Sequence, residues 1–252
     1  MAQLQDIVAF LERELKHDDI RDYPGAFNGL QLENSGVIER VVCAVDATLP
    51  VVEKVAELGS GSLLIVHHGM FWQGVQPVTG AFRRKLRCAM NADMAIFSSH
   101  LPLDVHPQWG NNALLANHLC LKQSSPFLDF KGLAVGLQGG WTGTAEELKK
   151  QLEQAVGGEV HLCAAGPTEI KRIGLVTGGA GSEVAQAAQA GVDAFITGEG
   201  PHWSYGLAEE LGIHLLFGGH YATETFGVKA LGAVLEKEFA LSWSFVDHSS
   251  GL

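Results

Sequence analysis

Short apolar runs alternate with amphipathic segments along most of this chain. Runs rich in Val, Ile and Leu predict buried strands, and the mixed segments between them predict helices. Strands are expected at 40–45, 62–66, 94–98, 133–137, 172–177, 194–197 and 214–217. Helices are expected at 4–16, 49–58, 81–91, 112–119, 144–156, 183–190, 204–211 and 223–238. This alternation predicts an α/β fold with mostly parallel strands.

Two pairs of segments show that the chain contains related halves. Residues 97–104 (FSSHLPLD) align with 217–224 (FGGHYATE), and residues 65–72 (IVHHGMFW) align with 196–203 (ITGEGPHW). In the first half, the segment 65–72 begins in a predicted strand that follows the strand 40–45 and the helix 49–58. In the second half, the segment 196–203 begins in a predicted strand that follows the strand 172–177 and the helix 183–190. The sequence therefore predicts two α/β halves built on the same plan.

A boundary between the halves is expected at the polar stretch 122–125, which Pro126 follows. The predicted divisions are 1–124 and 125–252. In open α/β sheets, ligands bind beyond the carboxyl ends of the strands. The histidines and carboxylates that follow the strands of both halves are therefore expected to form one metal site between the halves.

Composition excludes several classes of protein. The chain has 252 residues, of which 46% are hydrophobic and 18% are charged, as in ordinary globular proteins. Its formal net charge of −11 argues against nonspecific binding to nucleic acid phosphates. No apolar run reaches the about 20 residues that a membrane helix needs, and residues 1–16 lack a signal-peptide core.

The cysteines favour a reducing compartment. They are widely spaced, with no Cys-x-x-Cys pair, and three of them lie in apolar surroundings typical of buried thiols: Cys43, Cys120 and Cys163. Cys88 lies in a basic stretch, which does not indicate whether its thiol is buried. We therefore expect a cytoplasmic protein.

His67 and His68 are the first candidate metal ligands. Neighbours in a regular strand point to opposite faces, so both serve one site only if the backbone turns at the strand's end, before Gly69. Adjacent imidazoles can also serve two neighbouring metals. The alternative is one surface histidine and one buried histidine.

Two further pairs have a spacing of four residues. On a helix, His220 and Glu224 would share one face within reach of a single ion, although a solvent-facing pair is the alternative. His100 and Asp104 have the same spacing, but Pro102 disfavours a helix at the preceding residue, so an extended or turned loop is expected. Asp104 is the better ligand candidate, and His100 is a ligand, a partner of a ligand or a proton shuttle.

Together these clusters exceed one tetrahedral site. Three imidazoles and two carboxylates suit two metals that share a carboxylate or a water, and such a pair activates the water as a nucleophile. Without a thiolate, the set favours Zn, Fe, Mn, Co or Ni. The predicted ligands are His67, His68, Asp104, His220 and Glu224.

Other motifs are weaker. Glu199 aligns with His68 and is a candidate general base, with a turn carboxylate as the alternative. The nearby His202 has the same two interpretations, a catalytic group or a turn residue. The stretch 178–182 (GGAGS), between a strand and a helix, could cradle a phosphate at a helix N-terminus, but it lacks the Gly-Lys-Ser/Thr of a P-loop, so a tight turn is expected there. Residues 28–31 (NGLQ) are expected to form a turn without a chemical role.

The same residues resemble a known family. The chain is similar to the NGG-interacting factor three family, also called the GTP cyclohydrolase I type 2 family. The matching segments are 28–31 (NGLQ), 66–69 (VHHG), 100–104 (HLPLD), 110–112 (GNN), 197–199 (TGE) and 219–224 (GHYATE). The resemblance implies a dinuclear metal centre held by the five ligands named above, two α/β halves with the site between them, and a ring-shaped homohexamer. Some relatives carry a domain inserted between the halves, and the junction at 122–129 leaves no room for one.

The resemblance also suggests an activity. Opening a guanine imidazole ring is a hydrolysis, so a metal-dependent hydrolase acting on a nucleotide or a related heterocycle is the leading hypothesis, with His100 and Glu199 as the candidate catalytic residues. One alternative is oxidase-type chemistry if the metal is iron. Another is a metal-stabilised scaffold, or a ring that binds a partner without turnover. Trp109 and Trp141, expected to be exposed, support an oligomer.

Overall fold

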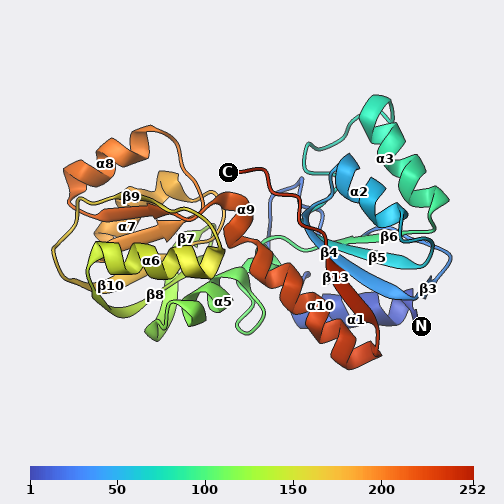
Figure 1. Ribbon diagram of the computed structural model, residues 1–252, viewed down its shortest axis with the longest axis horizontal. Coiled ribbons are helices and arrows are strands. Elements are labelled where there is room, and N and C mark those ends of the chain that lie inside the picture. The colour runs from blue at the N-terminus through green and yellow to red at the C-terminus, as the bar shows by residue number, and fades with distance from the viewer. The chain divides into compact units, whose positions relative to one another are not determined.

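The computed structural model describes residues 1–252, which form two compact units (Figure 1). The first unit comprises residues 1–103 and 227–248, and the second comprises residues 104–226 and 249–252. These bounds differ from the predicted division at 124/125, because the chain returns to the first unit near its end.

The first unit contains a five-stranded sheet in the order β13-β4-β5-β6-β2. All neighbouring strands are parallel except β2, which is antiparallel to β6. The strands of this sheet are β2 (Gly29–Leu32), β4 (Arg40–Asp46), β5 (Ser62–His68), β6 (Ala95–Ser98) and β13 (Ser242–Phe245). A separate two-stranded pairing joins β1 (Ala2–Gln3) and β3 (Val37–Ile38). The helices are α1 (Leu4–Leu15), α2 (Leu49–Ala56), α3 (Gly80–Asn91) and α10 (Thr225–Phe239).

Helices cover both faces of this sheet (Figure 1). Side chains of α2 and α3 pack with one face of β4, β5 and β6 in a core cluster that includes Val42, Leu64 and Ile96. On the other side, α1 contacts α10 through Phe10 and Phe239, whose ring centroids are 5.6 Å apart. Because both faces are buried, β4 and β5 are almost continuously apolar.

The last strand explains why the first unit is discontinuous in sequence. β13 pairs in parallel with β4, with Ser242 opposite Arg40. α10 packs closely beneath it, since a Cβ added at Gly232 would overlap the indole of Trp243 and lie 3.0 Å from the Cys43 sulfur. The C-terminal helix and strand thus complete a sheet that begins near the N-terminus.

The second unit contains a six-stranded sheet in the order β7-β8-β10-β11-β12-β9. Its strands are β7 (Lys122–Phe130), β8 (Leu133–Gly143), β9 (His161–Cys163), β10 (Ile170–Leu175), β11 (Ala194–Thr197) and β12 (His214–Phe217). Its helices are α5 (Asn111–His118), α6 (Ala145–Val156), the 3-10 helix η1 (Gly181–Glu183), α7 (Val184–Gln189), α8 (Trp203–Leu211) and α9 (His220–Thr223). One further turn, α4 (Leu101–Asp104), lies at the point where the chain passes from the first unit to the second.

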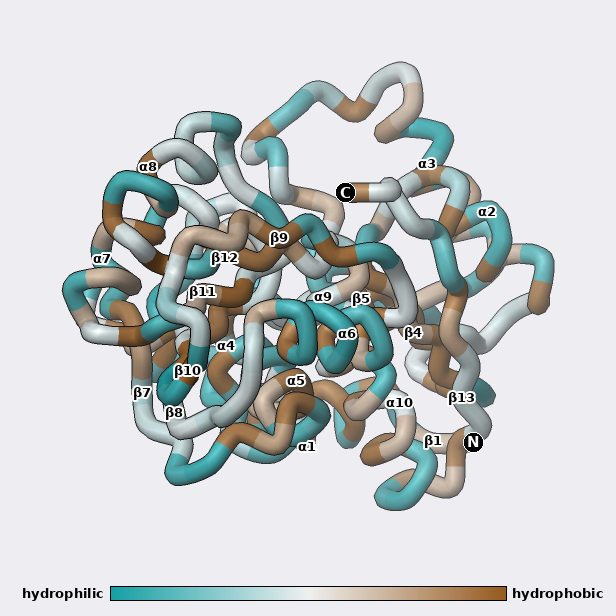
Figure 2. Tube along the Cα trace, turned by 60° about the vertical axis from the view of Figure 1, so that its left-hand side comes forward, coloured by the Kyte–Doolittle hydropathy of each residue, from teal (hydrophilic) through white to brown (hydrophobic).

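Neighbouring residues on the central strands of this unit face two different cores. Ile196 and Leu216 pack with α5 and α6, whereas Phe195 and Leu215 pack with α7 and α8. Hydrophobic residues are concentrated along β11 and β12 (Figure 2). The sheet is therefore the middle of three layers, which is why its central strands are short and apolar.

The α/β class and the relatedness of the halves are confirmed. In the first unit β4, β5 and β6 are parallel neighbours, and in the second unit β10, β11 and β12 are too. Helices connect the strands of each set: α2 and α3 in the first, α7 and α8 in the second. Both sheets are mixed, because antiparallel strands extend these parallel cores: β2 in the first unit and β7, β8 and β9 in the second.

Two segments predicted as turns or boundaries are strands. The segment 28–31, expected to form a turn, lies mostly within β2 (Gly29–Leu32), which pairs with β6. The expected boundary at 122–126 lies inside β7, whose Pro126 pairs with Leu137. β7 is an edge strand, where proline and exposed polar residues are tolerated, so its composition resembles that of a linker.

Three local expectations were wrong. Residues 101–104 form a helical turn rather than an extended loop, because Pro102 occupies its first turn, where no intrahelical N–H bond is lost. Cys120, expected to be buried, is exposed and has a left-handed conformation (φ 55°) after α5. All four cysteines are free thiols. Trp141 is buried and donates its indole N–H to Gln151 Oε1 at 3.1 Å.

A capping box lies at the start of α6. Thr144 Oγ1 accepts a hydrogen bond from the Glu147 amide, and Glu147 Oε2 accepts one from the Thr144 amide.

None of the helices has the length and hydrophobicity that crossing a membrane requires.

Candidate metal centre

His67 and His68 end strand β5 and their rings lie together. The ring centroids are 4.8 Å apart, as expected if the backbone turns before Gly69. His67 is fully buried and its Nδ1 lies 2.9 Å from the carbonyl oxygen of Ser99. His68 Nδ1 lies 2.9 Å from Asp46 Oδ1, at the end of the neighbouring strand β4. Each imidazole is thus fixed by an oxygen on the strand or loop beside it.

His100 joins this pair from the end of β6. Its ring centroid is 4.8 Å from that of His67 and 5.6 Å from that of His68. Its Nδ1 lies 2.8 Å from Asp22 Oδ1, and its backbone amide donates to Asn28 Oδ1 at 2.7 Å. Burial acts to raise the pKa of Asp22, but the hydrogen bonds and charge of His100, together with Asn28, outweigh it and lower the pKa. Asp22 is therefore an anionic partner for His100.

The three rings form one cluster whose ligand nitrogens all lie within 4.8 Å of one another. The Ser99 carbonyl accepts hydrogen bonds only, so Nδ1 of His67 carries the proton and Nε2 keeps its lone pair. Carboxylate oxygens that accept from Nδ1 set the same tautomer in His68 and His100. Histidines that bind metals usually have such an oxygen partner on the second ring nitrogen.

The NGLQ segment, for which no chemical role was expected, fixes the loops of this cluster. The Gln31 amide group donates to the carbonyls of Ala26 and Phe27, and its Oε1 accepts from the Met70 amide at 2.6 Å. Gly69 approaches so closely that an added Cβ would overlap the Gln31 amide group. Gln31 therefore holds the turn that directs His67 and His68.

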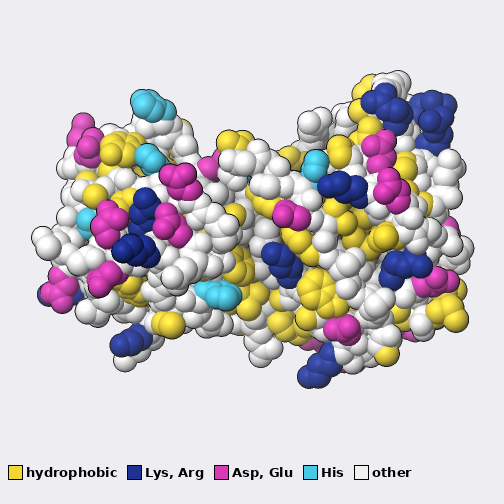
Figure 3. All heavy atoms as spheres, viewed as in Figure 1, with side chains coloured by type: hydrophobic (Ala, Val, Ile, Leu, Met, Phe, Trp, Pro, Cys, Tyr) yellow, Lys and Arg dark blue, Asp and Glu magenta, His cyan; other side chains and the backbone are white.

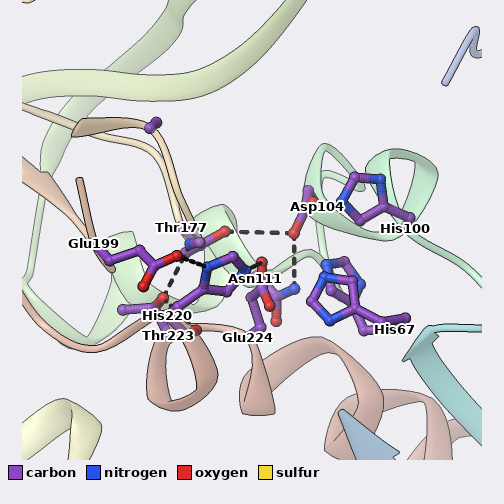
Figure 4. Close-up of polar contacts among 12 residues, drawn as sticks. His67, His100, Asp104, Asn111, Thr177, Glu199, His220, Thr223 and Glu224 are labelled. Atoms are coloured by element: carbon purple, nitrogen blue, oxygen red, sulfur yellow. Dashed lines mark hydrogen bonds and ion pairs between the residues drawn. The ribbon is translucent and has the colours of Figure 1, made fainter. Parts of the chain in front are cut away.

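In the second unit, Asp104 is buried and held by a polar network (Figure 4). Its Oδ1 accepts hydrogen bonds from Asn111 Nδ2 at 2.8 Å and Thr177 Oγ1 at 3.4 Å. Asn112 Nδ2 donates to the Asp104 backbone carbonyl at 3.0 Å, and Asn112 Oδ1 accepts from the Thr177 amide at 3.0 Å. The network sets the orientation of one carboxylate oxygen.

His220 and Glu224 adjoin each other after strand β12, as their spacing predicts. His220 Nε2 lies 3.2 Å from Glu224 Oε1, whose side chain is 3% exposed, so the solvent-facing alternative is wrong. His220 Nδ1 lies 2.9 Å from Glu199 Oε1 (Figure 4). Burial acts to lower the pKa of His220, but Glu224 and Glu199 outweigh it and raise the pKa to about 9. Glu199 is thus a direct partner of His220 rather than an isolated turn carboxylate.

The glycine stretch 178–182 encloses this pair. Gly178 has φ 74°, and an added Cβ there would overlap Glu224 Oε1. A Cβ added at Gly179 would lie 3.4 Å from the His220 ring. The missing side chains make room for the imidazole and carboxylate, which is a more specific role than the tight turn that we expected. His202, by contrast, is an exposed residue at the start of α8.

Several residues of this site gave no signal in the sequence. They are Asp22, Asp46 and Thr177, and each is a single polar residue whose partner in the site lies far away in the chain. Asn28, Gln31 and Asn111 lie in the segments 28–31 and 110–112 that match the family, but the sequence does not reveal their partners. The repeat offers one clue, since the regions around His100 and His220 correspond and both have carboxylate partners.

His17 supports this region from the first unit and makes its stability sensitive to pH. Its ring stacks on Phe97 with centroids 5.5 Å apart, and its Nε2 lies 3.0 Å from Ser99 Oγ. Burial lowers the pKa of His17 to about 4, although Asp18 and Asp22 act in the opposite direction. Because the unfolded chain binds this proton near pH 6.5, the contribution is complete above pH 6.5 and is lost as the pH falls towards 4.

We therefore expect wild type to lose more stability than a His17→Gln variant between pH 7 and pH 4.5. The difference should be about 2 kcal/mol, measured by urea unfolding at both pH values. His202→Gln, which removes an exposed histidine, should behave like wild type. Equal losses in wild type and His17→Gln would show that His17 is not kept neutral by burial.

The fold and these histidine–carboxylate pairs define an α/β protein with candidate metal-binding clusters. The chain belongs to the Duf34/NIF3 (NGG1p interacting factor 3) family, whose model matches residues 2–250. This confirms the family resemblance found in the sequence.

Curated relatives and a solved structure match almost the whole chain. A protein of Pyrococcus abyssi called GTP cyclohydrolase 1 type 2 homolog is 38% identical over 256 residues, covering 98% of this chain and 99% of the relative. A Deinococcus radiodurans protein of the same name is 37% identical over 238 residues, covering 91% and 88%. The crystal structure of TTHA1606 from Thermus thermophilus has a TM-score of 0.89 and 33% identity, with 100% of both chains covered.

Proposed function

We propose that this protein is a dinuclear-metal-dependent hydrolase that acts on a nucleotide or a related heterocycle. The observation that carries the proposal is a hydrogen-bond arrangement shared by three imidazoles. In His67, His68 and His220, Nδ1 lies 2.9 Å from a carbonyl or carboxylate oxygen. This arrangement directs Nε2 towards a ligand and increases its basicity.

The proposed ligands are His67, His68, Asp104, His220 and Glu224. Imidazoles and carboxylates suit Zn, Fe, Mn, Co or Ni. The spacing of His220 and Glu224 fits this role, because two ligand atoms each about 2.1 Å from one ion lie about 3–3.5 Å apart, and these atoms are 3.2 Å apart. The proposal requires both compact units to supply ligands to the same centre.

Two bound ions would supply Lewis acidity and an activated water for hydrolysis. His100 and Glu199 are the proposed proton-transfer residues. His100 can hold a proton at Nε2 while Asp22 stabilises the imidazolium through Nδ1. Glu199 has a side chain that is 43% exposed, and its Oε1 contacts His220. Both groups can therefore exchange protons without leaving their partners.

Metal content tests the ligand assignment. Protein purified without chelators and without oxygen should contain two ions per chain by elemental analysis, and a His68→Ala/Glu224→Ala double variant should contain few or none. His161→Ala, at an exposed histidine in β9, is a matched control that should keep both ions. The assignment fails if wild type and double variant contain the same amount of metal.

Activity is tested by a screen of wild-type protein against nucleotides, other heterocycles and phosphoesters, with and without added metal. Ring opening of a purine is followed by its ultraviolet spectrum, and release of phosphate by a colorimetric assay. Metal-dependent turnover of a nucleotide supports the proposal. A protein with full metal content and no turnover in the screen would favour a scaffold.

We further propose a cytoplasmic homohexamer, as the family resemblance implies. Free cysteines support a reducing compartment, and exposed Trp203 offers apolar contact surface. Light scattering at micromolar concentration should give a mass near six times 26.9 kDa. A monodisperse species of 26.9 kDa would contradict the ring.

A further inference from the structure

A pocket in the first unit lies beside His68 and extends away from it. Its volume is about 440 Å³, and its wall includes Asp46 and His68 at the ends of β4 and β5. The wall also includes Trp72, Gln76 and Lys85. Pockets that hold small ligands have volumes of about 300–1,000 Å³, so this one has room for a nucleoside-sized molecule.

One wall of the pocket carries a partly buried ammonium group. Lys85 is half-buried on α3, and burial lowers its pKa. It forms no ion pair with an acidic side chain in the structure. A cation that is desolvated without an anionic partner is costly, and an anionic ligand would offset that cost.

The middle of the helix that bears Lys85 is strongly basic. α3 contains Arg83, Arg84, Lys85 and Arg87 and no acidic residue, although the chain as a whole has a net charge of −11. Figure 3 shows Lys and Arg side chains gathered at the upper right, where α3 lies in Figure 1. A local positive potential of this kind attracts anionic ligands and speeds their association.

The other wall offers an aromatic surface. Trp72 is 42% exposed, and its indole centroid is 5.0 Å from the ring of His68. An exposed indole at a pocket stacks well on planar heterocycles, whatever their substituents. The side-chain amide of Gln76 adds hydrogen-bonding capacity at the rim.

We propose that this pocket binds a phosphorylated planar heterocycle, with its phosphate on Lys85 and its ring on Trp72 beside His68. The Asp46 carboxylate also faces the pocket and would repel a phosphate, but its Oδ1 accepts from His68 Nδ1. The phosphate is therefore assigned to the Lys85 side, and the ring to the His68 side. This inference rests on the proposed function in one respect: it identifies the substrate class as nucleotides rather than free bases or nucleosides.

Binding to metal-free protein tests the pocket without any turnover. Isothermal titration calorimetry is carried out with GMP, guanosine and ribose 5-phosphate. Lys85→Gln should raise the Kd of GMP at least 10-fold and leave that of guanosine within 2-fold. Trp72→Ala should raise the Kd of GMP and guanosine alike, by 5-fold or more. Arg84→Gln removes the same charge from the same helix outside the pocket wall, and it should change the Kd of GMP less than 3-fold.

Each other outcome overturns a defined part of the proposal. Wild-type protein that shows no binding of GMP at millimolar concentration removes the pocket altogether. Equal losses in Lys85→Gln and Arg84→Gln would indicate a general charge effect instead of a phosphate site. Ribose 5-phosphate that binds as tightly as GMP, with no effect of Trp72→Ala, would remove ring recognition.

The result is also separable from the hydrolase proposal. Binding with the expected dependence on Lys85 and Trp72, but no turnover in metal-loaded protein, would support the pocket and contradict the hydrolase. Turnover without nucleotide binding at this pocket would support the hydrolase and contradict the pocket. Thermal unfolding of each variant shows whether it is folded, including Trp72→Ala, which removes an indole that packs against the rings of Tyr23, His68 and His100.

Discussion

Asp104→Ala should lose both bound metal and hydrolytic activity, whereas His100→Ala and Glu199→Gln should lose activity and keep most of the metal. Asp104 is a buried anion whose Oδ1 is fixed by Asn111 and Thr177, so its removal takes a negatively charged ligand from the proposed centre. In Glu199→Gln the amide oxygen can still accept from His220 Nδ1. The rate with the substrate found in the screen should fall by at least about 10²-fold in all three variants, which is the low end for general acid–base catalysis.

The measurement is elemental analysis together with initial rates at saturating metal. Asp6→Ala, which removes an exposed carboxylate from α1, is the matched control and should change neither quantity. If His100→Ala and Glu199→Gln are both fully active, the proton-transfer assignment is wrong, whatever the metals do. If Asp104→Ala keeps both ions, Asp104 is not a ligand.

Removal of metal by a chelator should lower the melting temperature of wild-type protein by about 10 °C or more. A ligand present at 1,000 times its Kd stabilises the folded state by about 4 kcal/mol, and each kcal/mol corresponds to about 2–4 °C in a chain of this size. Asp104→Ala and the His68→Ala/Glu224→Ala variant should melt at the same temperature with and without chelator. A chelator effect that persists in both variants would place the stabilising metal elsewhere.

Most of the central fold was predictable because buried parallel strands are almost wholly apolar. β11 and β12 begin and end where the sequence places them, and β4 and β5 differ only at their ends. The edge strands were missed for the opposite reason. β7, β9 and β13 have few buried residues, and an exposed strand such as SWSF has no apolar run to distinguish it from a loop.

The candidate ligands were predictable, and their supporting partners were not. A spacing of four residues and a His-His pair are local patterns, so the sequence reveals His220 with Glu224 and His67 with His68. Asp46, by contrast, meets His68 only because β4 and β5 are paired, which no local pattern shows. The Ser99 carbonyl that fixes His67 belongs to the backbone and has no residue signature at all.

The position of β13 has a consequence for how the chain folds during synthesis. Its partner β4 (Arg40–Asp46) precedes β13 (Ser242–Phe245) by almost 200 residues, so β13 leaves the ribosome long after β4. Until then, one edge of an apolar parallel sheet is unpaired, and the groove filled by Trp243 against Gly232 is empty. The second unit has all its strands before that moment. A nascent chain that stalls between α9 and β13 therefore carries all the strands of the second unit and, in the first unit, one open sheet edge that is prone to aggregation.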